Sequence, residues 1–332
     1  MNLVFGRGRL FAAGGMVLLF AGMVFCVSCR ETGAGRENAP VHVRRYEQAL
    51  MQADTAHLQQ ALARMAAEFP LFFEGADLSD TLGIRQIRFF IQDPVVKLLY
   101  QRVEAEYGAD SLRLGRDLSA LFSRVRELEP GFSAPEVYTY ISCLDYRHRV
   151  LYQDSVLVIS IDLYVEGNQD LLDEAGIPRY LSRRLNAGYL RPDVARALGS
   201  ALLGKKEPSS LLDNIVEQGK VMWFMRQVLP DVPAFALIGY TEEQYEWCRA
   251  NEARIWHYLV QQDLIFETNP FEYRYFVNDG PFNPMMPGAP ARLARFVGWQ
   301  MVDAYVRQSG ADWSVLRQAD ARTVLEVSRY KP

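Results

Sequence analysis

The N-terminal segment constrains the fold most, because its sequence pattern predicts that it is not part of the folded domain. Two arginines precede an uncharged apolar stretch at residues 10–27, which Ser28 and Cys29 follow. Positive charge, an apolar run and a small residue in this order are typical of an export signal. The cysteine directly after the small residue favours a lipoprotein signal at residues 1–28, with the thiol of Cys29 carrying the lipid.

An uncleaved membrane helix is the alternative interpretation of this segment. An apolar stretch of about 18 residues is near the minimum for crossing a bilayer, and Cys26 stands where lipoprotein signals usually have Leu. We expect the lipoprotein form, because Gly14, Gly15 and Gly22 weaken the membrane-helix interpretation. Several acyl chains on one residue would then hold the protein to a membrane, where a single chain binds only marginally. Residues 29–42 then form a flexible tether. Since no acidic run follows Cys29, we expect the anchored protein to face the periplasm in the cell envelope.

The charge balance argues against nucleic acid as a partner. Residues 1–28 hold two of the 36 basic residues and none of the 40 acidic ones, so their removal changes the net charge from −4 to −6. Binding to a phosphate backbone needs a basic surface. We expect residues 43–332 to form a single domain, in which Cys143 and Cys248 are free thiols or, alternatively, a disulfide.

The spacing of apolar residues predicts a mainly helical body. Helices are predicted at residues 43–69, 110–129, 211–229, 241–262 and 291–308. Two β-branched and aromatic runs, at residues 137–141 and 156–161, predict strands. Residues 266–290 are rich in Asn, Gly and Pro and are predicted to form a loop. The predicted fold class is therefore α+β, a helix-dominated body with one small antiparallel sheet.

The residue types that usually carry catalysis form no recognisable motif. The four histidines are dispersed, and no two of them stand at i, i+4 spacing on a predicted helix. Zinc hydrolases place two imidazoles in that way, with a glutamate beside them. No Gly-x-Ser-x-Gly turn is present either. The sequence therefore predicts no catalytic residues, no metal and no cofactor.

Four stretches of the sequence resemble the gliding motility lipoprotein GldB family. They read LVISIDLYVEG, IVEQGKVMWFMRQVLP, IGYTEEQYEWCRANEARIWHYLVQQDLIFET and VGWQMVDAYV, and they occur in the family's order. The resemblance covers about residues 44–325. It implies an envelope lipoprotein that serves the gliding and type IX secretion machinery. Family members also resemble predicted zinc proteases in overall layout, which implies a zincin-like body.

The resemblance allows a comparison with the zinc-binding helix of such proteases. Residues 216–220, Val-Glu-Gln-Gly-Lys, fall where that helix carries His-Glu-x-x-His, and Glu252 falls at the third ligand. Glu217 matches the general base, but Val216 and Lys220 replace the imidazoles and cannot hold Zn²⁺. The comparison implies a pseudo-metalloprotease without activity, in which Lys220 takes the place of the metal and pairs with Glu217 or Glu252. An i, i+3 surface pair of Glu217 and Lys220 is the alternative.

A groove beside this helix is the candidate binding surface. Its candidate residues are Asp162, Tyr164, Trp223, Trp256, Phe276 and Trp299. Bonding to backbone is the commoner role for an acid at the end of a strand, and packing is the commoner role for the aromatic residues. The sequence favours a non-catalytic binding or scaffold role, with proteins of the gliding and type IX secretion machinery as partners. An active metal-dependent peptidase and a module that binds peptidoglycan or peptide are the alternatives.

Overall fold

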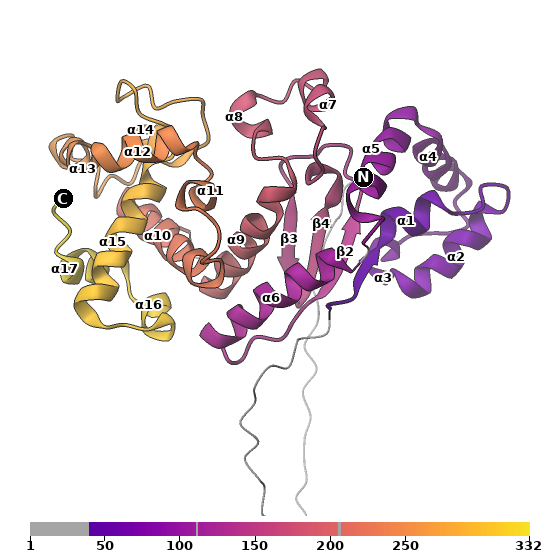
Figure 1. Cartoon of the computed structure of the whole chain (residues 1–332), viewed down its shortest axis with the longest axis horizontal. Coiled ribbons are helices and arrows are strands. Elements are labelled where there is room, and N and C mark those ends of the chain that lie inside the picture. The colour runs from indigo at the N-terminus through magenta and orange to yellow at the C-terminus, as the bar shows by residue number, and fades with distance from the viewer. Residues whose placement is uncertain (1–39, 111, 205–206) are drawn as a thin grey trace, which may run out of the picture. The chain divides into compact units, whose positions relative to one another are not determined.

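The computed structural model describes residues 40–110, 112–204 and 207–332 (Figure 1). The predicted signal, Cys29 and the predicted tether as far as residue 39 lie outside the described residues. The described residues belong to one unit, in which helices surround a small sheet. The predicted helix-dominated α+β class is confirmed, while the zincin-like layout stays a prediction. Among the described residues, no helix combines the length and the apolar content needed to cross a bilayer.

The sheet has four strands in the order β1-β2-β4-β3. They are β1 Val43–Arg45, β2 Glu136–Tyr140, β3 Val150–Gln153 and β4 Val156–Ser160. β2 pairs in parallel with β1 and with β4, while β3 pairs antiparallel with β4. The sheet is therefore mixed, and the prediction of an antiparallel sheet is wrong. The reason is the path of the chain: β3 and β4 form a hairpin, and its second strand, not its first, lies beside β2.

Apolar side chains cover both faces of the sheet. Val137, Leu157 and Ile159 belong to the larger hydrophobic core. Their neighbours Tyr138 and Val158 pack in a smaller core with residues of the N-terminal helices. Strands buried on both faces are apolar at successive positions, which explains the unbroken apolar run of β4.

In the described residues between β1 and β2, the chain forms six helices. They are α1 Tyr46–Met51, α2 Leu58–Glu68, α3 Pro70–Phe73, α4 Thr81–Gln92, α5 Pro94–Tyr107 and α6 Arg113–Leu128. The carboxylates of Asp80 and Asp93 accept N–H groups from the first turns of α4 and α5, which is a common way to start a helix. The prediction of one helix at residues 43–69 is wrong, because Val43–Arg45 pairs with β2 and a turn separates α1 from α2. The helix predicted at residues 110–129 is confirmed as α6.

The chain enters the described body along α6. The backbone N–H of Val41 donates to Ser119 Oγ at 2.8 Å and to the carbonyl oxygen of Gly115 at 3.2 Å. A Cβ atom on Gly115 would lie 2.4 Å from the carbonyl oxygen of Val41, so glycine permits this close approach. Val41 falls within the predicted tether, and in the structure it is bound to α6.

The remaining elements follow β4. They are η1 Ile161–Leu163, α7 Gln169–Glu174, α8 Arg179–Ser182, η2 Ala187–Tyr189, α9 Leu190–Leu203, α10 Leu211–Val228, α11 Ala234–Ile238, α12 Glu242–Ala250, α13 Glu252–Gln261, α14 Pro270–Val277, α15 Leu293–Ser309, α16 Trp313–Gln318 and α17 Ala321–Ser328. α9 contacts β3 on one side and α10 on the other, so it joins the sheet to the C-terminal helices (Figure 1).

Two of the predicted C-terminal segments differ from the structure. The helix predicted at residues 241–262 starts as expected, with a capping box between Thr241 and Gln244, but it is interrupted at Asn251 and forms α12 and α13. The loop predicted at residues 266–290 contains α14, whose first turn holds Pro270 and is capped by the Asn269 side chain. Asn followed by Pro is a helix-start signal. The helices predicted at residues 211–229 and 291–308 are confirmed as α10 and α15.

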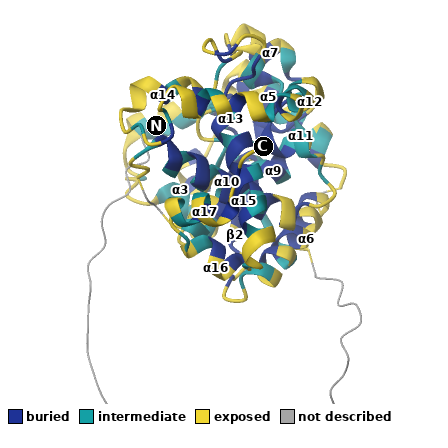
Figure 2. Ribbon diagram, turned by 90° about the vertical axis from the view of Figure 1, so that its left-hand side faces the viewer, coloured by how far each residue is buried: buried dark blue, intermediate teal, exposed yellow. Residues whose placement is uncertain are grey.

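α10 and α15 cross in close contact at two glycines. A Cβ atom on Gly298 would lie 1.9 Å from the carbonyl oxygen of Ile215, and one on Gly219 would lie 2.2 Å from the carbonyl oxygen of Gly298. Both helices are mostly buried (Figure 2). The backbones therefore touch here, and no larger residue fits at either position without moving a helix.

Candidate functional site

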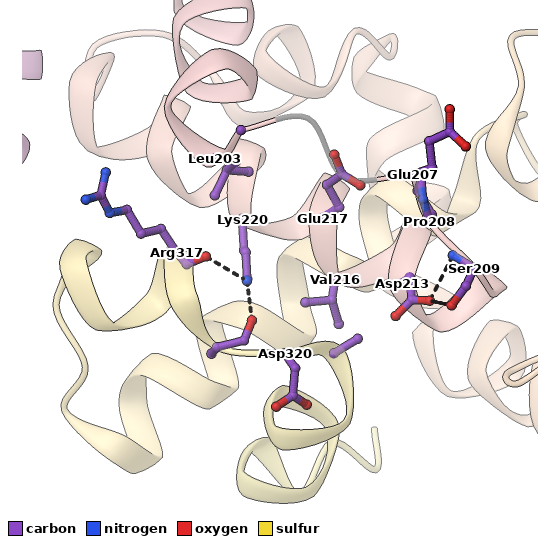
Figure 3. Close-up of a pocket in the computed structure, with 13 residues that line it drawn as sticks. Leu203, Glu207, Pro208, Ser209, Asp213, Val216, Glu217, Lys220, Arg317 and Asp320 are labelled. Atoms are coloured by element: carbon purple, nitrogen blue, oxygen red, sulfur yellow. Dashed lines mark hydrogen bonds between the residues drawn. The ribbon is translucent and has the colours of Figure 1, made fainter. Parts of the chain in front are cut away.

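A cavity of about 240 Å³ lies where the first half of α10 faces the connection between α16 and α17 (Figure 3). We call it the α10 pocket. It is lined by Leu203, Gly204, Glu207, Pro208, Ser209, Asp213, Val216, Glu217, Lys220, Arg317, Ala319, Asp320 and Ala321. Three of the four predicted zinc-site positions, Val216, Glu217 and Lys220, are therefore brought together on its wall.

The start of α10 fixes one side of the pocket. Ser210 Oγ accepts the N–H of Asp213, and the Asp213 carboxylate accepts from the N–H of Ser209 at 3.0 Å and from its hydroxyl at 2.6 Å. Burial opposes ionisation of this carboxyl, but the hydrogen bonds from both serines lower its pKa overall. Two serines followed by an acid at the third helical position are a helix-start signal, so this part of the site had a recognisable pattern that our prediction of the site missed.

Lys220 crosses the pocket and binds main-chain carbonyls. The residue is buried, with only 7% of its surface exposed. Its Nζ donates to the carbonyl oxygen of Arg317 at 3.3 Å and to that of Ala319 at 2.5 Å (Figure 3). The last carbonyls of a helix have no partner within it and carry partial negative charge. Lys220 therefore neutralises the C-terminal end of α16 and links it to α10.

Glu217 and Val216 complete this part of the wall. Glu217 is half-buried and lies one helical turn before Lys220, and Val216 is buried and presents an aliphatic surface. On the opposite side, the Asp320 carboxylate caps α17 through the N–H and hydroxyl of Thr323. The pocket thus combines both signs of charge with an aliphatic floor.

Glu252, the predicted third ligand, has a different environment. It does not line the α10 pocket, and its Oε1 accepts a hydrogen bond from the hydroxyl of Tyr330 at 2.8 Å. Burial and the nearby Glu252 raise the pKa of Tyr330, so the phenol stays protonated and donates. The comparison with a zinc helix predicts Glu252 beside Val216, Glu217 and Lys220. In the structure Glu252 does not line their pocket.

Metal ligands are not clustered in the described part of the chain. In residues 40–110, 112–204 and 207–332, no group of three or more His, Cys, Asp or Glu side chains is arranged to hold a metal ion. At the α10 pocket, an aliphatic side chain and an ammonium group stand where imidazoles would be needed. The residues present there do not fit a zinc ion.

Two of the predicted groove residues are buried and bonded inside the fold. The Asp162 carboxylate accepts the N–H groups of Ser142 and Leu144 at 2.9 and 2.8 Å. Burial raises its pKa, although these bonds favour the ionised form. The hydroxyl of Tyr164 donates to Asp193 at 2.9 Å. Asp162 therefore orders the turn after β2, which is the commoner role for an acid at this point in a strand.

The four aromatic groove residues are packed within the larger core or against it. Trp223 stacks on Trp313 with ring centroids 6.2 Å apart. Trp256 meets Tyr330 edge-on at 5.1 Å and lines a second cavity beside α13 and α17. Phe276 and Trp299 are buried in the larger core. The structure does not bring the six predicted residues together in one groove.

The two cysteines of the described chain are free thiols. Cys143 is exposed, whereas Cys248 is buried and its pKa is raised to about 12 by burial. The predicted alternative of a disulfide between them is not formed.

Fold and site together define a helix-dominated α+β protein with a charged pocket. In this pocket Lys220 donates hydrogen bonds to the carbonyl oxygens of Arg317 and Ala319, at the C-terminal end of α16. A family model described as gliding motility protein GldB matches residues 31–332. The chain belongs to the GldB family of gliding motility lipoproteins, and the resemblance found in the sequence is confirmed. A search of curated proteins and a search of solved structures found no match. The relationship to zinc proteases stays a prediction.

Proposed function

We propose that this gliding motility lipoprotein is anchored to an envelope membrane through Cys29, faces the periplasm and acts without catalysis. In this proposal it is a binding or scaffold component of the gliding and type IX secretion machinery. Family membership supports the motility role, and the cysteine that follows the export signal supports the anchor.

The observation that carries the non-catalytic part is the environment of Lys220. A working zinc helix needs a neutral imidazole at this position, free to turn toward the metal. Here the ammonium lies against the carbonyl oxygens of Arg317 and Ala319. A positive charge in this place repels a divalent cation, and its bonds serve the packing of α16 on α10. The pocket therefore favours a structural or binding role.

Hydrolysis is tested with the Glu217→Gln variant, which is nearly isosteric and removes the carboxylate that a metallopeptidase would use as its base. We expect cells carrying it to spread on agar like the wild type at equal protein level. The purified wild-type protein should contain no stoichiometric zinc and should cleave peptides at the same rate before and after chelation. Zinc at one per chain, with hydrolysis that the chelator and Glu217→Gln both abolish, would falsify the non-catalytic role.

Partner and anchor are tested in intact cells. Cross-linking followed by mass spectrometry should capture gliding and type IX secretion proteins, and capture of peptidoglycan fragments alone would favour the binding-module alternative. Palmitate labelling should mark the wild type but not Cys29→Ala, with Cys26→Ala as the matched control that keeps its label. Equal labelling of wild type and Cys29→Ala would contradict the anchor.

A further inference from the structure

Six arginines from distant parts of the chain meet near the end of α11. They are Arg149, Arg183, Arg184, Arg196, Arg292 and Arg295, and we call them the arginine cluster. Several of them donate to the last carbonyls around α11: Arg196 to Leu237 at 2.7 Å and Arg292 to Gly239 at 2.9 Å. The partial negative charge of a helix end attracts cations, but it is small beside six full positive charges.

Two carboxylates are paired with the cluster among the described residues. Asp193 binds Arg149 at 2.7 Å. Asp279 bridges two buried arginines, accepting from Arg184 Nη2 at 3.0 Å and from Arg292 Nε at 3.1 Å. In the hydrogen bonds described, Arg183, Arg196 and Arg295 donate to neutral oxygens and sulfur. The cluster therefore holds more positive than negative charge.

Burial and the surplus positive charge together lower the pKa of buried arginines in the cluster. Burial, followed by the charge of Arg292, lowers the pKa of Arg184 to about 10. Burial together with Arg196 and Arg292 also lowers the pKa of Arg295. The Nε–H groups of Arg183 and Arg184 are buried and have no hydrogen-bond acceptor in the described structure. Buried cations that lack full compensation are strongly unfavourable, so an added anion would be stabilised here.

The members of the cluster come from both loops and helices, and two of the groups around it are partly exposed. Arg183 and Arg184 follow α8, Asp279 follows α14, and Arg292 precedes α15. Arg292 has a φ of 62°, a left-handed conformation that is costly for a residue with a side chain and is retained where the surroundings enforce it. Arg183 is half-buried, and the side chain of Asp279 is 43% exposed. The charges of these two side chains interact, which acts to raise the pKa of Arg183 against the effect of its burial.

We propose that the arginine cluster binds a phosphate group at the position between Arg184 and Arg292 that the Asp279 carboxylate occupies. Guanidinium groups bind phosphate through paired, charge-assisted hydrogen bonds, and a dianion would offset more of the surplus charge than one carboxylate does. In this proposal the buried Arg184 and Arg292 donate hydrogen bonds to the phosphate from the interior, and the half-buried Arg183 donates from the more exposed side. Asp279, already in contact with solvent, turns outward when the phosphate enters.

Calorimetric titration of the full-length protein in detergent with inorganic phosphate tests this site. We expect binding by the wild type and a loss of affinity of at least about tenfold in Arg183→Gln, which removes one charge-assisted donor. Arg179→Gln is the matched control, since it removes the same charge from an exposed position on α8 that pairs with Asp173, and its affinity should be unchanged. Asp279→Asn should bind phosphate more tightly than the wild type, because the competing carboxylate has lost its charge.

Three results would overturn the proposal: no binding by a wild-type protein with a normal circular dichroism spectrum, equal losses in Arg183→Gln and Arg179→Gln, or weaker binding in a folded Asp279→Asn. The higher phosphate affinity expected for Asp279→Asn cannot result from unfolding. This variant therefore tests the proposal even if Arg183→Gln folds poorly. The source of the phosphate is distinguished by repeating the titration with glycerol phosphate and with dihexanoylphosphatidic acid, which are both phosphomonoesters. Preference for the first identifies a soluble phosphomonoester, and preference for the second identifies a lipid headgroup.

Discussion

Replacement of Gly298 by Ala should destabilise the protein, because the added methyl group has no space between α10 and α15. The new Cβ would lie 1.9 Å from the carbonyl oxygen of Ile215 and 3.0 Å from the backbone nitrogen of Gly219, and real Cβ contacts essentially never fall below 3.0 Å. Both neighbours are backbone atoms, so no side-chain rotation relieves the overlap. The two helices must move apart by about 1 Å, and close-packed interiors resist such a shift.

The size of the effect follows from two opposing contributions. Overpacking a core costs about 1–3 kcal/mol, and the upper end applies because backbone must move. Alanine gains about 1 kcal/mol over glycine inside a helix. The free energy of unfolding should therefore fall by about 2 kcal/mol. Urea denaturation followed by tryptophan fluorescence measures it, with the slope of the transition unchanged.

Matched variants separate the packing effect from the substitution itself. Gly83→Ala places a Cβ 3.0 Å from a side-chain oxygen of Asp80, the capping residue of α4. Only a small shift of this carboxylate is needed and no helix has to move, so stability should change by less than about 1 kcal/mol. Gly219→Ala should reproduce the loss, since its Cβ would lie 2.2 Å from the carbonyl oxygen of Gly298. The double variant should lose less than the sum, because one separation of the helices relieves both contacts. A Gly298→Ala protein as stable as the wild type would refute this account of the crossing.

Three further predictions concern charged groups. Lys220→Met should lower the free energy of unfolding by about 2 kcal/mol, since two carbonyls lose a charged donor, whereas the exposed-site control Lys97→Met should change little in the same denaturation assay; equal effects would contradict the role of Lys220. Burial raises the pKa of Asp303 to about 6, above its unfolded value, so its ionisation should reduce stability as pH rises from about 4 through 6. Asp303→Asn should therefore be more stable than the wild type at pH 7.5 by an amount that vanishes near pH 4, and a pH-independent difference in melting temperature would argue against it. Tyr164→Phe should lower stability by about 1–3 kcal/mol, because Asp193 loses a buried donor, and thermal melting that matches the wild type would show that this bond contributes nothing.

The fold class was predictable where local pattern and tertiary packing agree. Apolar spacing located α6, α10 and α15, and capping residues located the start of α12. Strand pairing was not predictable from the same information, since it depends on which strand of the β3–β4 hairpin meets β2. The unbroken apolar run of residues 156–160 was the available clue, because it is typical of strands covered on both faces.

The site was predictable only in part, for a physical reason. The 216–220 helix face is contiguous in sequence, so its residues reach one pocket. The partners of Lys220, by contrast, are main-chain carbonyls about a hundred positions later, and any residue type supplies a carbonyl. The arginine cluster gave no pattern at all, since its members come from loops and helices spread between residues 149 and 295 and are united by the fold alone.

The attachment of the first described residues has a mechanical consequence for a motility protein. β1 is an edge strand joined to β2 in parallel register through three residue pairs, and Val41 just before it is bonded to α6. A pull on the chain just before Val41, directed along the strand axis, loads these bonds in shear, so that they resist together rather than opening one after another. Force applied to the chain before Val41 would thus enter at the sheet edge and at α6 and would reach the C-terminal helices through the rest of the domain.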